Sequence, residues 1–217
     1  MIDSITWISQ YVMEADRWLL LAINGAHTPG LDAIMWAITG KWVWLPFYLL
    51  LVCAVWRHKD RRSAVLFLFA VALCIMLADV TCGQILRGPI GRLRPSNPEN
   101  PISQYIHLVN NYHGGSYGFP SCHAANSFGL AMLIALYFRR RSVTLIILAW
   151  SALQCYSRMY LGVHYPTDIL AGILFGGSYA MICWQFTEYH REMPVRELKS
   201  HRLVWGWERT ALQSGHV

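Results

Sequence analysis

The chain has 217 residues, enough for one domain with a complete core, and its net charge at pH 7 is +6. Hydrophobic residues make up 55% of it and charged residues only 14%, whereas soluble domains carry about 25% charged residues. This deficit indicates an integral membrane protein. A basic chain can also bind nucleic acid, but here the charges fall mainly in short loops beside apolar segments, which argues against that role.

The N-terminal segment, residues 1–41, is apolar but interrupted. Charged side chains that include Asp16 and Arg17 prevent an uninterrupted run of about 20 apolar residues between positions 4 and 26. Aromatic and leucine side chains recur between these charges, as in amphipathic helices that lie in the membrane interface. We therefore expect interfacial helical pieces here, including a short helix at residues 31–39. A further membrane span in this segment is the weaker alternative.

Five apolar segments follow and are expected to cross the membrane. They lie at residues 42–56, 63–86, 121–138, 142–157 and 166–187. Tryptophan residues flank the first of them, as aromatic residues do at membrane interfaces. We predict an all-α integral membrane bundle of five transmembrane helices, or six if the N-terminal segment also crosses. The single domain would comprise an interfacial segment (1–41), the bundle (42–189) and a cytoplasmic tail (190–217).

Lysine and arginine are unequally distributed between the two sides of this bundle. The loops at residues 57–62 and 139–141, together with the tail after Tyr189, hold twelve of the eighteen. Because cytoplasmic loops carry the excess of positive charge, these segments are expected inside. The long loop at residues 87–120 and the turn at residues 157–166 then share the outer side of the membrane.

The outer turn before the last span holds three residues suited to chemistry. Arg158, His164 and Asp168 fall within the stretch SRMYLGVHYPTD, and such groups at a membrane edge are costly unless they face a site. His164 and Asp168 are four residues apart, so a helical or turn backbone puts them on one face. The carboxylate would then fix the tautomer of the imidazole, and the guanidinium is suited to phosphate. A turn with a satisfied histidine would explain these residues if they stood alone.

A second stretch, RGPIGRLRP, begins where the second span meets the outer surface. It contains Arg87, Arg92 and Arg94. Arg87 and Arg94 are seven residues apart, which is two helical turns, so we expect one helix face to present both to a phosphate until Pro95 ends the helix. Arginines in such places also bind lipid headgroups by charge alone.

A third stretch, GFPSCH, precedes the next span. We expect Pro120 in the first turn of that helix, together with Ser121, Cys122 and His123. Free backbone N–H groups and the positive end of the helix dipole make such a position an anion site. Ser121 adds a hydroxyl donor, and His123 can hold a proton for a leaving group. The alternative is a capped helix start with an interfacial histidine.

Together these residues suit phosphoryl transfer through a phosphohistidine. One imidazole would attack, the other would protonate the leaving oxygen, and the cations would stabilise the equatorial oxygens. The pattern contains no metal-ligand cluster, and neither a metal nor another cofactor is expected.

The three stretches resemble the signature of the type 2 phosphatidic acid phosphatase (PAP2) superfamily, which reads KxxxxxxRP, PSGH and SRxxxxxHxxxD. The resemblance runs from the arginine-rich stretch to the end of the outer turn. It implies that His164 is the nucleophile, that Asp168 orients it and that His123 is the general acid. It also implies that the phosphate is held at Arg87, Arg94, Ser121, Cys122 and Arg158.

Two positions depart from the signature. Arg87 stands where the family has lysine, which keeps the charge but presents a bulkier, planar head. Cys122 stands where the family has glycine, and its side chain restricts the backbone whose N–H would approach the phosphate. Neither change removes a chemical group from the mechanism.

The resemblance predicts a metal-independent lipid phosphatase in a bacterial inner membrane, with its site facing the periplasm or exterior. Its partners would be the bilayer and a lipid phosphate, and the oligomeric state is left open. On the resemblance alone, undecaprenyl pyrophosphate ranks first and a lipid A phosphate second, ahead of phosphatidylglycerol phosphate and phosphatidic acid. The alternatives are a lipid-to-lipid phosphotransferase and a lipid-binding membrane protein without turnover.

Overall fold

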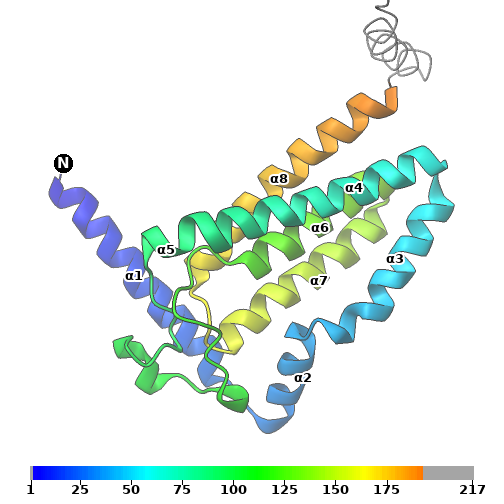
Figure 1. The fold of residues 1–217 in the computed structure, drawn as a ribbon. Coiled ribbons are helices and arrows are strands. Elements are labelled where there is room, and N and C mark those ends of the chain that lie inside the picture. Colours follow the sequence, from blue (N-terminus) through cyan, green and yellow to red (C-terminus); the bar gives the residue numbers. More distant parts are fainter. Residues whose placement is uncertain (1, 193–217) are drawn as a thin grey trace, which may run out of the picture.

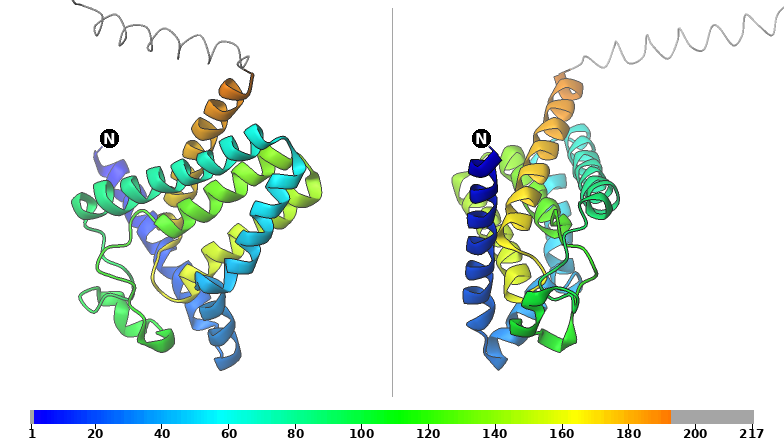
Figure 2. Two further views of the ribbon diagram at one scale, coloured as in Figure 1. Left: turned by 45° about the vertical axis from the view of Figure 1, so that its right-hand side comes forward. Right: turned by 90° about the vertical axis from the view of Figure 1, so that its left-hand side faces the viewer.

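The computed structural model describes the backbone of residues 2–192 and the side chains of residue 7 and residues 10–192. Over this range the chain folds into helices and connecting loops (Figures 1 and 2), as predicted. The α-helices are α1 (Ile2–Gly25), α2 (Pro29–Thr39), α3 (Leu45–His58), α4 (Arg61–Ala78), α5 (Arg87–Ile90), α6 (Cys122–Phe138), α7 (Arg141–Tyr160) and α8 (Pro166–Glu192). A π-helical stretch, Asp79–Leu86, joins α4 to α5. Of the predicted cytoplasmic tail, residues 190–192 belong to α8, and the rest lies outside the described residues.

Each of the five predicted spans coincides with a helix of the bundle. By length and hydropathy, two continuous helical stretches of the described chain could cross a membrane, Arg61–Ile90 and α8. Helices α2 and α3 add a third candidate if they form one broken span, bent by 68°. The apolar helix α6 is shorter, with 17 residues. The number of helices that cross the bilayer therefore stays a prediction.

Helix α6 lies at the centre of the bundle, packed against α4, α7 and α8. Its closest approach is to α8, where a Cβ on Gly176 would lie 2.1 Å from the backbone oxygen of Ala125. A Cβ on Gly172 would lie 2.4 Å from the backbone oxygen of Ser121. Small residues allow helix backbones in membranes to approach in this way. The contact brings the start of α6 to the start of α8, where the Ser121 N–H donates to the backbone oxygen of Asp168 (3.0 Å).

Helix α1 crosses the bundle at the ends of α7 and α8 (Figure 1). The side chain of Asn24 donates to the backbone oxygen of Tyr160 (2.7 Å) at the end of α7. Asp16 accepts from the backbone N–H of Thr167 (2.9 Å) at the start of α8. Residues 4–25 thus belong to one helix and not to separate amphipathic pieces, whereas α2 covers the short helix expected at residues 31–39. Asp16 and Asn24, which interrupt its apolar run, are buried against the protein because partners distant in sequence satisfy them.

The arginine-rich stretch departs from its prediction. Helix α5 ends at Ile90, and Gly91 adopts the left-handed conformation (φ 62°) that commonly ends helices. The chain then continues in an extended form, and Leu93 forms an isolated bridge with Tyr117. The expected helix that would carry both Arg87 and Arg94 is therefore wrong, because the glycine ends it before Pro95 can.

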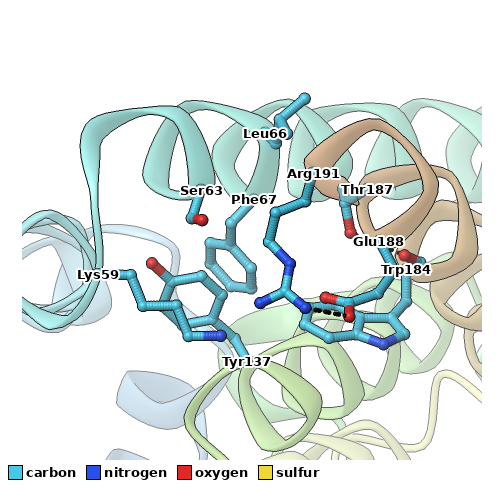
Figure 3. A pocket seen from close by; sticks show the side chains of 9 residues that line it. All are labelled: Lys59, Ser63, Leu66, Phe67, Tyr137, Trp184, Thr187, Glu188 and Arg191. Atoms are coloured by element: carbon cyan, nitrogen blue, oxygen red, sulfur yellow. Dashed lines mark hydrogen bonds and ion pairs between the residues drawn. The ribbon is translucent and has the colours of Figure 1, made fainter. Parts of the chain in front are cut away.

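At the end of the bundle where α8 finishes, side chains fill most of the space between the helices (Figure 3). The pocket between α4, α6 and α8 has a volume of only about 10 Å³, room for about one water molecule. The ammonium group of Lys59 lies 4.8 Å from the ring centre of Tyr137, and Arg191 pairs with Glu188 at 2.7 Å. This pocket is therefore too small for a substrate.

The α6–α8 contact can be tested with one methyl group. Gly176→Ala places a Cβ against the α6 backbone, which cannot yield as a flexible side chain would. Overpacking typically costs about 1–3 kcal/mol, so we expect the melting temperature in detergent to fall by about 2–12 °C for a chain of this length. Gly30→Ala is the matched control, because a Cβ there meets no atom within 4 Å. Equal melting temperatures for the two variants would contradict this packing.

Candidate active site

The predicted site residues converge where α5, α6, α7 and α8 meet the long loop. They are His123, His164 and Asp168, with Arg87, Arg94, Ser121, Cys122 and Arg158. The convergence results from tertiary packing, since the residues come from three separate stretches of the chain. The structure therefore brings together the groups that the motifs indicated, including Arg94, which reaches the site from the extended loop and not from a helix.

His164 lies in the loop between α7 and α8 and is only 1% exposed. Its Nε2 is 3.1 Å from Nη1 of Arg94, and its Nδ1 is 3.4 Å from Oδ2 of Asp168. A guanidinium can only donate, so Nε2 is the accepting nitrogen and Nδ1 carries the proton. This geometry fixes the tautomer and leaves the Nε2 lone pair on the side of the arginines.

The surroundings of His164 keep its ring neutral. Burial lowers the pKa of His164 well below its ordinary value of 6.5, and the charges of Arg94, Arg158 and Arg87 lower it further. Because the neutral imidazole is the nucleophilic form, the ring is ready to attack at neutral pH.

Arg94 is held firmly in the loop. Its guanidinium donates to the backbone oxygens of Tyr117 (3.0 Å) and Val163 (3.1 Å) as well as to His164. Burial lowers the pKa of Arg94 to about 10, with contributions from the charges of Arg158 and Arg87. The group is therefore still cationic at pH 7 and is fixed beside the nucleophilic nitrogen.

Arg158 and Arg87 carry unused donors. Arg158 binds the hydroxyls of Thr39 (2.7 Å) and Tyr112 (3.3 Å), and Arg87 donates to Sγ of Cys122 (3.0 Å). The Nε–H groups of both arginines are buried, and residues 10–192 provide no acceptor for them. Buried donors without acceptors are rare in folded proteins. An anion with several oxygens would satisfy them.

The start of α6 supplies further donors. Ser121 is the N-cap, and its Oγ accepts from the Ala124 N–H (3.4 Å), so the helix begins at Cys122. Pro120 therefore precedes the cap and does not lie in the first helical turn, which corrects the prediction. The cap accounts for one N–H group of the first turn, and the remaining N–H groups and the helix dipole favour an anion here.

His123 contacts Gln154, a residue of α7 that the motifs did not indicate. Nε2 of His123 is 2.9 Å from Oε1 of Gln154, whose amide nitrogen donates to the backbone oxygen of Ile38 (3.0 Å). The second bond fixes the amide orientation, so Nε2 must be the protonated nitrogen of a neutral His123. Nδ1 is then the position that can take up or release a proton.

Asp168 is fully buried and uses both of its oxygens. Oδ2 accepts from the Tyr165 N–H (2.9 Å) and faces His164, while Oδ1 accepts from Nη1 of Arg92 (2.6 Å). Arg92 was not among the predicted phosphate-binding residues, and the structure pairs it with this carboxylate. Sequence spacing alone could not distinguish it from its arginine neighbours.

A cavity of about 470 Å³ adjoins the site between α3, α4, α6 and α7. Apolar side chains, including Leu51, Val71 and Leu130, line most of it, and His123 and Lys41 lie among its polar residues. Largely apolar cavities of this size with a few polar groups are typical ligand sites. The cavity therefore offers an apolar compartment beside a cationic one.

Comparisons with known proteins show which family the chain resembles. The sequence profile described as PAP2 superfamily matches residues 63–192. The lipid A 4′-phosphatases of Bacteroides thetaiotaomicron and Porphyromonas gingivalis are 45% and 34% identical over 77% of this chain, and the matches cover 75% and 70% of those proteins. The undecaprenyl-diphosphatase BcrC of Bacillus subtilis is 27% identical over 78% of this chain and 83% of its own length.

A solved structure shares the fold. The crystal structure of the transmembrane PAP2-type phosphatidylglycerolphosphate phosphatase from Bacillus subtilis superposes with a TM-score of 0.61 at 23% identity. The match covers 85% of this chain and 90% of that one. The profile match, the relatives and the converging motifs lead to one conclusion: the chain belongs to the PAP2 superfamily and is a membrane lipid phosphatase.

Proposed function

We propose that this lipid phosphatase acts on lipid A and releases its 4′-phosphate. Two relatives with that name are more similar to this chain than the undecaprenyl-diphosphatase is. Their similarity supports placing lipid A ahead of undecaprenyl pyrophosphate, in reverse of the order drawn from the family resemblance alone. The observation that carries the chemistry is the buried, neutral His164, whose Nε2 faces Arg94.

Hydrolysis would proceed in two displacements. Nε2 of His164 attacks phosphorus, the bond from phosphorus to the lipid oxygen breaks, and His123, which enters this step protonated at Nδ1, gives that proton to the leaving oxygen. A water molecule then attacks the phosphohistidine, and His123 takes up one proton of that water. The P–N bond breaks, which releases inorganic phosphate and restores the neutral ring of His164.

The remaining residues would stabilise charge. Arg94, Arg158 and Arg87 surround the nucleophile, and the start of α6 adds N–H donors, so the phosphoryl oxygens would meet preorganised positive charge. Asp168 would hold the Nδ1–H tautomer and stabilise the positive charge that the ring acquires on phosphorylation.

The apolar cavity supports a lipid substrate. It lies beside His123, so a headgroup bound at the arginines could place an acyl chain in the cavity. The distribution of basic residues supports a site on the outer side of the bacterial inner membrane. Helix α1, which crosses the site-bearing ends of α7 and α8, would then lie near the outer interface.

The first test is phosphate release by the detergent-purified protein from lipid A, undecaprenyl pyrophosphate, phosphatidylglycerol phosphate and phosphatidic acid. We expect inorganic phosphate from lipid A, unchanged by EDTA and reduced at least about 1,000-fold in His164→Ala because the nucleophile is lost. Transfer of phosphate to a second lipid would indicate a phosphotransferase. Lipid binding without release or transfer would indicate a protein without turnover.

The pH profile tests the neutral state of His164. Its lowered pKa predicts that kcat/KM, corrected for ionisation of the substrate phosphate, stays level as the pH falls through 6.5. Below pH 6.5 the unfolded chain protonates this histidine while the folded state keeps it neutral. The free energy of unfolding should therefore decrease as the pH falls below 6.5. Half-loss of corrected kcat/KM near pH 6.5 would show an unperturbed histidine and contradict the proposed electrostatics.

A bulky side chain in the cavity tests the acyl-chain site. Val71→Trp fills part of the cavity, so KM for a long-chain substrate should rise about tenfold, while a short-chain water-soluble phosphate ester is unaffected. Val65→Trp is the matched control on the same helix, because that side chain is exposed and does not line the cavity. Equal KM values for the two variants would place the chains elsewhere.

A further inference from the structure

Helix α1 contributes a buried carboxylate next to the site. Asp16 is only 3% exposed. Because carboxylates are rarely buried without partners, its contacts indicate what holds it there. Its Oδ1 accepts from the backbone N–H of Thr167 (2.9 Å), and its Oδ2 accepts from Nη2 of Arg92 (2.5 Å) and from the Thr167 hydroxyl. All these contacts are made with residues that adjoin the nucleophile and its carboxylate.

Arg92 connects this carboxylate to the catalytic pair. Nη2 binds Asp16 (2.5 Å) while Nη1 binds Oδ1 of Asp168 (2.6 Å), and the guanidinium lies over the ring of Tyr165, 4.2 Å from its centre. Since Oδ2 of Asp168 faces Nδ1 of His164, a continuous series of polar contacts runs from α1 to the nucleophile. Arg92 uses one nitrogen for each carboxylate, and Asp168 uses one oxygen for Arg92 and the other for His164. Each group therefore orients the next.

The two oxygens of Asp168 have different partners, and this gives the series of contacts a function beyond stability. Arg92 holds Oδ1, which prevents rotation of the carboxylate and keeps Oδ2 at His164. It also offsets part of the negative charge of Asp168, and Asp16 in turn offsets part of the charge of Arg92. A buried ion pair is weak evidence for stability in itself. The Arg92–Asp168 pair, however, orients the carboxylate that faces the reactive ring.

We propose that Arg92 and Asp16 are positioning residues for His164 and that α1 is thereby part of the catalytic machinery. The inference rests on the proposed function. It predicts opposite electrostatic effects. Without the charge of Arg92, Asp168 favours protonated His164 more strongly. Without the charge of Asp16, Arg92 offsets Asp168 more completely and protonated His164 is favoured less. The other ionisable groups facing the ring stay unchanged in both variants: Arg94 from the loop, Arg87 from α5, His123 from α6 and Arg158 from α7.

The test compares Arg92→Gln and Asp16→Asn with wild type, using phosphate release from the lipid that wild type hydrolyses. Neither residue has a described contact with the phosphate-binding arginines, so KM should change less than about threefold. We expect kcat to fall about 10–100-fold, the range typical of outer partners of metal-bound histidines. The acid limb of the pH profile should move to higher pH in Arg92→Gln and to lower pH in Asp16→Asn. Glu14→Gln is the matched control, because it removes an exposed acidic charge from the same helix and should behave as wild type.

A purely structural role would lower the yield of folded protein and leave the pH profile of the folded fraction unchanged. That result, or acid limbs that move in the same direction, would overturn the inference. If wild type released no phosphate from any lipid, the proposed function would fail separately. The ¹⁵N spectrum of histidine-labelled protein would then decide, with His164→Gln to assign the resonance. The inference requires that wild type and Glu14→Gln show the Nδ1–H tautomer of His164. It also requires that Arg92→Gln and Asp16→Asn show an altered His164 signal, and identical spectra for all four proteins would refute it.

Discussion

The imidazole of His164 is held between a carboxylate at Nδ1 and a guanidinium at Nε2, and the rest of the site depends on this contact. Burial and three neighbouring arginines make protonation of the ring unfavourable, while Asp168 makes one tautomer favourable. The ring is therefore neutral, oriented and surrounded by positive charge before any substrate binds. Such an arrangement stabilises a phosphoryl group without reorganisation at the moment of reaction. The Nε–H groups of Arg87 and Arg158, which are buried and have no acceptor among residues 10–192, belong to the same preorganisation.

The helices hold this arrangement through close backbone contacts. Gly172 and Gly176 allow α8 to touch α6, which brings the capped start of α6 to Asp168. The loop after Gly91 carries Arg92 and Arg94 toward opposite sides of His164, one to its carboxylate and one to its reactive nitrogen. The apolar cavity then opens beside His123. The same packing that excludes water from the nucleophile thus leaves a compartment suited to a lipid chain.

Local spacing was sufficient to predict some of this structure. The four-residue separation of His164 and Asp168 predicted their contact, and the apolar segments predicted the helices of the bundle. The shared helix for Arg87 and Arg94 was wrong because Gly91 was a stronger helix terminator than Pro95 four residues later. The roles of Asp16 and Gln154 could not be predicted, since each depends on a partner far away in sequence. In sequence, Asp16 indicated only an interrupted apolar run, whereas burial shows it to be a residue with a specific ionic partner.

The covalent intermediate gives the most direct measurement of the central claim, that His164 is the nucleophile. Wild-type protein would be mixed briefly with lipid A labelled in its 4′-phosphate, quenched in alkali to preserve phosphohistidine, and mapped by peptide mass spectrometry. The structure predicts phosphate on Nε2 of His164, stable in alkali and lost in acid, because this nitrogen carries the lone pair that faces Arg94. Phosphate on His123 or Cys122, or turnover with no labelled residue, would contradict the assignment of His164.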